Sequence, residues 1–193
     1  SYDIAYLSNL PNFITMAASD DLELARMIYT CSEINHAPSA FRYPRGPGLG
    51  IEIKKPLKKL TIGKGKIVCE GNDVAFLSYG ARLQEVKIAS EILEKHKISS
   101  TIADARFCKP LDKKLVLDLA KNHRLIITVE EGSIGGFGSH VSNFLIKSNS
   151  KLRNGMLLDN IELPDKFINQ DNPYKMYSTA KMNGLDIANR VIK

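Results

Sequence analysis

The sequence predicts an α/β fold of three layers (α/β/α), with a mainly parallel sheet of about five strands that follows the tail of a second α/β domain. Two observations carry this prediction. Apolar segments of strand length alternate with amphipathic helical segments along the chain, as in parallel sheets covered on both faces. The segment 125–129, Leu-Ile-Ile-Thr-Val, is apolar or β-branched throughout, which is typical of a strand buried on both faces.

The first fifty residues supply a strand, a helix and a second strand. Residues 12–17 are apolar enough for a short strand. The spacing of Asp20 and Glu23 predicts a helix start, and apolar residues on one face carry that helix to about Asn35. The second strand is expected at 38–43.

These elements are too few to close a sheet alone. The run Pro44-Arg45-Gly46-Pro47-Gly48 ends the second strand, because proline cannot donate to a sheet ladder and glycine favours turns. The chain also begins at Ser1 rather than at a methionine. We therefore expect residues 1–50 to be the tail of a larger domain, and the chain to be the carboxy-terminal portion of a longer protein.

Residues 51–60 are interpreted as a linker, and residues 61–193 as one domain of ordinary size. A hairpin is expected from 66–70 and 74–78, around Gly71-Asn72-Asp73. The other elements predicted in this domain are a helix at 81–95, a strand at 101–104, a helix capped by Asp112, the strand at 125–129, a helix around 141–145, a strand at 157–161 and a helix at 185–192.

Composition excludes several classes of protein. No apolar run approaches the ~18 residues of a membrane-spanning helix, and no secretion signal opens the chain. The net charge is +6, but the densest basic stretch, Lys54-Lys55-Pro56-Leu57-Lys58-Lys59, contains no aromatic residue and is interpreted as a solvated linker. We therefore expect a cytoplasmic protein that binds neither nucleic acid nor membrane.

The cysteines and histidines give little support to a metal site. The three cysteines are widely spaced and odd in number, which argues against a zinc site and a disulfide framework. The histidines form no H-x-x-x-H pair. His96 and His123 lie near predicted helix ends, where a histidine stabilises the negative end of the helix dipole. Only His140 is near a candidate site.

Ligands of open parallel sheets bind outside the carboxyl ends of the strands, and four strand ends here carry polar clusters. In the first cluster, Arg42 lies in the strand and Arg45 follows Pro44 on the loop beyond it. The guanidinium group of Arg45 can grip a phosphate or carboxylate through two parallel hydrogen bonds. Pairing of both arginines with acidic neighbours is the alternative.

The other three clusters are expected to be structural. Residues 104–112 are interpreted as a turn with an internal ion pair. The glycine-rich turn at 130–139 lacks the spacing of a dinucleotide or phosphate loop, and its two glutamates would repel phosphate. Its glycines are attributed to tight packing, although a functional role for Gly135–Gly138 or for His140 stays open. Residues 163–168 are interpreted as a turn after the last strand.

Together these segments resemble a known family. The matching runs are 1–7, 38–46, 62–65, 104–112, 129–131 with the glycines that follow, and 163–168. The chain resembles the carboxy-terminal portion of 1-deoxy-D-xylulose-5-phosphate synthase, a transketolase-type thiamine-diphosphate enzyme. The run Arg42-Tyr43-Pro44-Arg45-Gly46 resembles this synthase in particular. The runs 104–112 and 130–132 resemble the wider superfamily, which includes transketolases and the beta subunits of 2-oxo acid dehydrogenases.

The resemblance implies a transferase that joins pyruvate to glyceraldehyde 3-phosphate with loss of carbon dioxide, for isoprenoid and thiamine biosynthesis. It implies a homodimer that uses thiamine diphosphate and magnesium. Residues 1–50 would be the tail of the pyrimidine-binding domain, and residues 61–193 the transketolase C-terminal domain. Arg45 matches the family arginine that binds the phosphate of the acceptor aldehyde, whereas Arg42 is interpreted as a structural arginine of the strand.

The family's magnesium motif, its catalytic glutamate and its active-site histidines have no counterpart in the sequence. No catalytic, cofactor-binding or metal-binding residue is therefore assigned, and the chain alone is expected to be inactive and to bind no cofactor. A transketolase or a 2-oxo acid dehydrogenase beta subunit is one alternative. The other is a non-catalytic module that serves assembly or ligand sensing.

Overall fold

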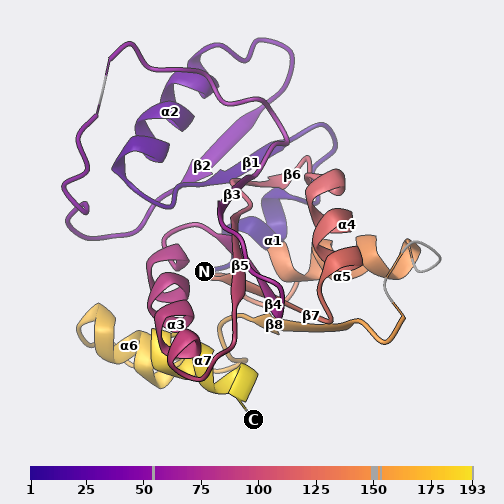
Figure 1. Cartoon of the computed structure of the whole chain (residues 1–193). Helices are drawn as coiled ribbons and strands as arrows, with labels where there is room; N and C mark the ends of the chain where they lie inside the picture. The colour runs from indigo at the N-terminus through magenta and orange to yellow at the C-terminus, as the bar shows by residue number, and fades with distance from the viewer. Residues whose placement is uncertain (54, 149–151, 153, 193) are drawn as a thin grey trace.

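The structure, a computed structural model, describes residues 1–53, 55–148, 152 and 154–192 (Figure 1). The helices and strands in this part of the chain are α1 Asp3–Leu7, β1 Ile14–Ala17, α2 Asp21–Ser32, β2 Ser39–Arg42, β3 Lys66–Cys69, β4 Val74–Tyr79, α3 Leu83–Lys95, β5 Ser100–Asp104, β6 Phe107–Lys109, α4 Lys113–Asn122, β7 Leu125–Glu130, α5 Phe137–Lys147, β8 Leu157–Ile161, α6 Pro173–Thr179 and α7 Gly184–Ile192.

The larger sheet has five strands in the order β3-β5-β4-β7-β8. The strands β5, β4, β7 and β8 run parallel, and β3 lies antiparallel to β5 at one edge. This confirms the α/β fold with a mainly parallel sheet. The central strand β4 is buried along its whole length, as a parallel strand covered on both faces must be.

Helices cover both faces of this sheet. Alternate residues of each strand point to opposite faces, so each face has its own set of buried side chains. On one face Ala75 and Leu77 of β4 pack with α4 and α5 in one buried cluster. On the other face Val74 and Phe76 pack with α3 and α7 in a second cluster. The predicted three-layer arrangement is therefore present (Figure 1).

The hairpin expected from 66–70 and 74–78 is wrong. β5 lies between β3 and β4 and pairs with both of them. The turn between β3 and β4 packs instead on the segment before β5, where the Asp73 carboxylate accepts a hydrogen bond from the Ser99 amide at 2.7 Å. The physical reason is burial: β4 needs strand neighbours on both sides, whereas the four residues of β3 are exposed and suit an edge.

A second sheet has three strands in the order β2-β1-β6. The strands β1 and β2 run parallel, and β6 joins β1 in antiparallel orientation. The first two strands thus obtain their third neighbour from a segment beyond the expected linker. No sequence pattern indicated β6, which has three residues, nor the short helices α1 and α6.

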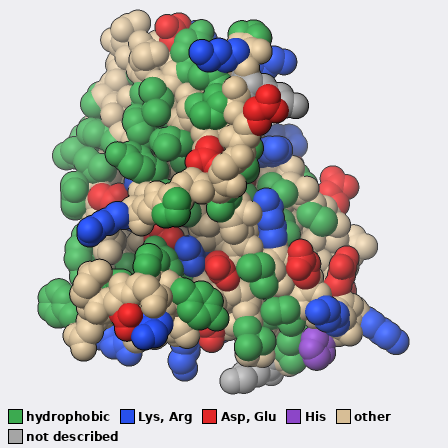
Figure 2. Space-filling model, turned by 90° about the vertical axis from the view of Figure 1, so that its left-hand side faces the viewer, with side chains coloured by type: hydrophobic (Ala, Val, Ile, Leu, Met, Phe, Trp, Pro, Cys, Tyr) green, Lys and Arg blue, Asp and Glu red, His purple; other side chains and the backbone are tan. Residues whose placement is uncertain are grey.

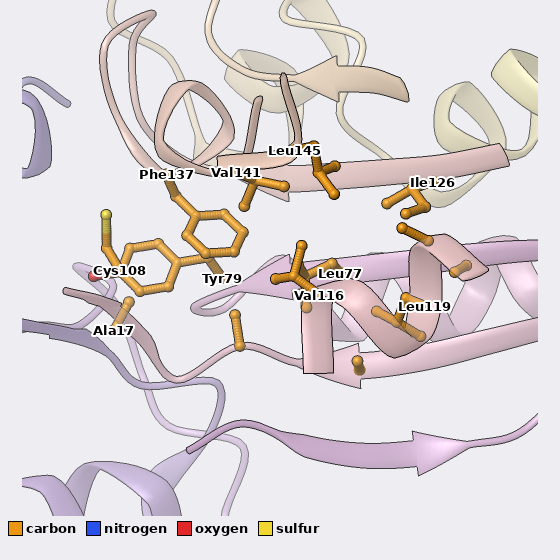
Figure 3. Close-up of a cluster of buried hydrophobic side chains, with 14 of the residues drawn as sticks. Ala17, Leu77, Tyr79, Cys108, Val116, Leu119, Ile126, Phe137, Val141 and Leu145 are labelled. Carbon is orange, nitrogen blue, oxygen red and sulfur yellow. The ribbon is translucent and has the colours of Figure 1, made fainter. Parts of the chain in front are cut away.

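The two sheets share a buried cluster of side chains (Figure 3). The rings of Tyr79 and Phe137 stack with centroids 4.9 Å apart. Ala17 of β1 and Cys108 of β6 belong to the same cluster, beside Tyr79. Burial raises the pKa of the Cys108 thiol to about 12, so this cysteine behaves as a packing residue rather than as a nucleophile.

Two helix starts confirm the capping predictions. The Asp20 carboxylate accepts a hydrogen bond from the Glu23 amide at 2.8 Å, and the Asp112 carboxylate accepts one from the Leu115 amide at 3.1 Å. The helix α2 ends at Ser32, three residues before the expected Asn35. Within the described residues, no helix has the length and apolar character needed to cross a membrane.

Candidate functional site

The carboxyl ends of strands from both sheets open onto one groove, with a cavity volume of about 1740 Å³. Its walls come from the ends of β1, β2, β4, β7 and β8, and from the segment 162–177 that follows β8. Acidic and basic side chains are interspersed among apolar ones on the face that Figure 2 shows. The groove is therefore large, mixed in character and suited to a polar ligand or to another chain segment.

Arg45 lies in this groove, on the loop beyond β2. Its side chain is exposed, and it makes no hydrogen bond or ion pair with the residues that the structure describes. Pro44 precedes it and restricts the backbone there. The alternative that Arg45 pairs with an acidic neighbour is not seen, so its guanidinium group is free to bind an anion.

Arg42, the last residue of β2, has partners on two other segments. Its Nη1 donates to the backbone oxygen of Glu131 at 2.9 Å, and its Nε lies 3.3 Å from the Asp3 carboxylate. The Arg42 side chain is 22% exposed. These contacts join the end of β2 to α1 and to the turn after β7, so Arg42 is held in place rather than free.

A second arginine of the same groove, Arg82, forms an ion pair with Glu131. Arg82, which follows β4, donates from Nε to the Glu131 carboxylate at 2.8 Å. The Arg82 guanidinium also lies 3.7 Å from the centre of the Tyr177 ring on α6. Burial, with a further effect of Glu131, raises the pKa of Tyr177 to about 12. Its phenol is therefore neutral at physiological pH.

The glycine-rich turn after β7 encloses a carboxyl group of the chain itself. Oε1 of Glu130 accepts a hydrogen bond from the Gly138 amide at 2.8 Å, in the first turn of α5. A Cβ atom on Gly132 or Gly136 would lie 2.3 or 2.5 Å from Oε2 of Glu130. Since Glu130 occupies the positive end of α5, the turn has no vacancy there for a phosphate.

Asp104 and Arg106 form a buried polar cluster with the first region of the chain. Arg106 Nη2 lies 2.6 Å from the Glu23 carboxylate on α2, and the Asp104 carboxylate accepts a hydrogen bond from the Ser19 hydroxyl at 2.7 Å. Burial raises the pKa of Asp104 to about 6. The expected ion pair within 104–112 is not found among the described residues, and Arg106 pairs instead with Glu23 on α2.

Comparison with known proteins decides the family. Residues 63–183 match the model of "Transketolase, C-terminal domain", which is more than half of the chain. The chain belongs to the transketolase C-terminal domain family. The fold of this chain is also found in solved transketolase structures.

One similar structure is a "Split gene transketolase, inactive beta4 tetramer", with a TM-score of 0.82 and 23% identity. The alignment covers 98% of this chain and 60% of that one. Another is a transketolase mutant from Pichia stipitis in complex with xylulose 5-phosphate, with a TM-score of 0.66 and 13% identity. That alignment covers 96% of this chain and 25% of that one. The chain thus spans about three fifths or less of the length of these relatives.

The histidines of this transketolase C-terminal domain chain lie outside the groove. His123 is buried at the end of α4, with its ring nitrogens 2.9 to 3.0 Å from Thr101 Oγ1 and from the backbone oxygens of Gly71 and Leu119. His140 lies on α5, and burial lowers the pKa of its ring. In the part of the chain that the structure describes, no three His, Cys, Asp or Glu side chains group as metal ligands would.

Two features of the groove escaped the sequence patterns. Arg82 and Tyr177 were not singled out, although the position of Arg82 just after a buried strand is a signal of the same kind as that of Arg45. The segment 163–168, interpreted as a turn, lines the groove, and its Phe167 side chain is 93% exposed. This exposed apolar ring belongs to the wall of the groove.

Proposed function

We propose that this chain is the carboxy-terminal part of a 1-deoxy-D-xylulose-5-phosphate synthase, in which Arg45 binds the phosphate of glyceraldehyde 3-phosphate. The observation that carries the proposal is the free guanidinium group of Arg45 in a groove at the carboxyl ends of the strands. The run Arg42-Tyr43-Pro44-Arg45-Gly46, which resembles this synthase in particular, supports the same assignment.

The proposed reaction forms a carbon–carbon bond between a two-carbon unit of pyruvate and the aldehyde carbon of glyceraldehyde 3-phosphate, and carbon dioxide leaves. Arg45 takes no part in bond formation. It binds the phosphate end of the acceptor through charge-assisted hydrogen bonds, which are worth about 1.5–3 kcal/mol. This binding orients the aldehyde at the other end of the acceptor. In this proposal the product serves isoprenoid and thiamine biosynthesis, and the enzyme is cytoplasmic.

Thiamine diphosphate and magnesium belong to this proposal, but the described residues do not fit them. No group of three metal-ligating side chains is found among them, and the one glycine-rich helix start is filled by Glu130. We propose that both are bound by parts of the enzyme outside this sequence. The cofactor supplies the nucleophilic carbon there, and the residues of this chain orient the acceptor.

A homodimer is part of the same proposal. The split-gene relative is described as a tetramer, which supports assembly of chains of this type. Large apolar side chains are exposed at the rim of the groove, among them Tyr2, Tyr43 and Phe167. Such side chains favour burial against another domain or subunit.

A transketolase is the second candidate, because both of the solved relatives described above are transketolases. The split-gene relative is described as inactive, and this also favours a chain that acts only when assembled with another. The two enzymes differ in their donor: pyruvate for the synthase, a ketose phosphate for transketolase. A non-catalytic assembly module would use neither.

The deciding experiment is a turnover assay of the full-length gene product that carries this chain, with the 193-residue chain assayed beside it. Both receive pyruvate, glyceraldehyde 3-phosphate, thiamine diphosphate and magnesium. Deoxyxylulose phosphate from the longer protein only is the expected result. Turnover with xylulose 5-phosphate but not with pyruvate would overturn the synthase assignment in favour of transketolase.

A further inference from the structure

The loop that carries Arg45 is held at its two ends. At the first end the backbone oxygen of Arg42 accepts a hydrogen bond from the Ala18 amide at 3.0 Å, and the Arg42 side chain contacts Asp3 and Glu131. At the other end the Ile51 amide donates to the Asp21 carboxylate at 3.2 Å. Arg45 lies on the stretch between these anchors.

Between the anchors the loop has few restraints. No residue from 44 to 50 makes a hydrogen bond or ion pair with the described part of the chain. A Cβ atom built on Gly46 would meet no atom within 4 Å, although one on Gly48 would meet the Asp21 side chain. Arg45 therefore has no anchor of its own. The nearer of the two anchors is Arg42, three residues before it, so the position of Arg45 depends most on Arg42.

We infer that Arg42 is a positioning residue: its guanidinium group, fixed between Asp3 and Glu131, sets where Arg45 presents itself to the anion. The inference rests on the proposed function of Arg45. Three features support it. The partners of Arg42 lie on two other segments, α1 and the turn after β7. Both partners, the Asp3 carboxylate and the Glu131 backbone oxygen, are acceptors. The planar guanidinium group of arginine bridges them in one fixed geometry.

The role differs from that of a phosphate ligand. Arg42 already uses Nη1 in a hydrogen bond and Nε in an ion pair with protein oxygens, whereas Arg45 has no such partner among the described residues. Loss of the Arg42 side chain leaves the charge of Arg45 and the Ala18–Arg42 backbone hydrogen bond in place, but removes the contacts with Asp3 and Glu131 that fix this end of the loop. The acceptor phosphate then binds more weakly, and pyruvate binds as before.

The test compares Arg42→Ala, Arg45→Ala and the double variant in the full-length synthase, with KM measured for each substrate. Arg42→Ala is expected to raise KM for glyceraldehyde 3-phosphate about tenfold, with KM for pyruvate unchanged. The double variant should be no worse than Arg45→Ala, because a positioning residue acts through the residue it positions. Arg42→Lys keeps the charge without the fork and should lie between wild type and Arg42→Ala.

Arg26→Ala is the matched control for a structural effect. Arg26 also bridges a backbone oxygen and a carboxylate, those of Lys58 and Glu23, and its side chain is 23% exposed. It does not line the groove. A similar loss of thermal stability in Arg26→Ala and Arg42→Ala, with only Arg42→Ala affecting KM, supports the inference.

Two results would overturn the inference while leaving Arg45 in its role: additive effects in the double variant, or equal rises of both KM values in Arg42→Ala and Arg42→Lys. An unchanged KM for the aldehyde phosphate in Arg45→Ala would instead overturn the proposed function, and the inference with it. Arg42→Lys answers the question if Arg42→Ala does not fold.

Discussion

Oε1 of Glu130 accepts a hydrogen bond from the amide of Gly138 at 2.8 Å, so a carboxyl group of the chain itself caps α5. Its other oxygen, Oε2, is buried and has no hydrogen-bond partner. Burial raises the pKa of Glu130 to about 7, although the backbone amides of α5 and Arg42 lower it. Glu162, a second carboxyl group nearby, raises it further.

The raised pKa predicts a specific pH dependence of stability. Between the ordinary value of 4.5 and the folded value of about 7, the folded state holds a proton that the unfolded state releases. The contribution of Glu130 to the free energy of unfolding is therefore fully present below pH 4.5 and is lost as the pH rises through 7. The total loss is about 3 kcal/mol. Glu130→Gln keeps the shape without the titration, so its stability relative to wild type should increase over this range.

Denaturant unfolding of both proteins from pH 4.5 to 8 checks this prediction. Asp104 also has a raised pKa, and taking the difference between the two proteins removes its contribution. Glu94→Gln, at an exposed position on α3, serves as the control and should leave the pH dependence unchanged. A constant difference between wild type and Glu130→Gln across the range would contradict the burial of an ionisable Glu130.

The enclosure of Glu130 predicts that Gly136 tolerates no side chain. A Cβ atom there would lie 2.5 Å from Oε2 and 2.9 Å from Oε1 of a carboxyl group fixed on α5. Gly136→Ala should therefore lower the free energy of unfolding by about 1–3 kcal/mol, as overpacking does in other buried sites. Gly46→Ala, in open space, should be close to wild type. Equal stability of the two variants in denaturant unfolding would contradict the steric exclusion of a side chain at Gly136.

The buried pair of Arg106 and Glu23 predicts a large effect from removing one partner. Arg106→Ala would leave the Glu23 carboxylate buried and unpaired except for Arg26, at a loss of about 3–5 kcal/mol. Arg190→Ala is the comparison, because Arg190 forms a bidentate but exposed pair with Asp159 and should lose less than about 1 kcal/mol. Calorimetric or denaturant unfolding measures both, and similar losses would contradict this account.

Buried strands and capped helices could be predicted because their signals are local. The apolar run of β7 and the Asp20 and Asp112 caps each depend on residues a few positions apart. The pairing of β3 could not be predicted in this way. Its four residues are exposed, so no burial pattern opposed the turn signal of Gly71-Asn72-Asp73, and only the position of β5 decides its neighbour.

The candidate site shows the same division. The position of Arg45 at the strand end, in the groove, could be predicted from its place after a strand, and its role stays a proposal. The partners of Arg42 and Arg82 could not, because Glu131 lies 89 and 49 residues away from them along the chain. Such contacts depend on which strand ends meet, and this follows from strand order rather than from spacing in the sequence.

The central claim is that Arg45 binds the phosphate of the acceptor, and substrate kinetics of Arg45→Ala in the full-length synthase test it most directly. Loss of charge-assisted hydrogen bonds should raise KM for glyceraldehyde 3-phosphate about ten- to a hundredfold and leave KM for pyruvate close to wild type. Arg45→Lys, which keeps the charge without the bidentate fork, should recover part of the loss. Equal changes in both KM values, or no change in either, would contradict the assignment.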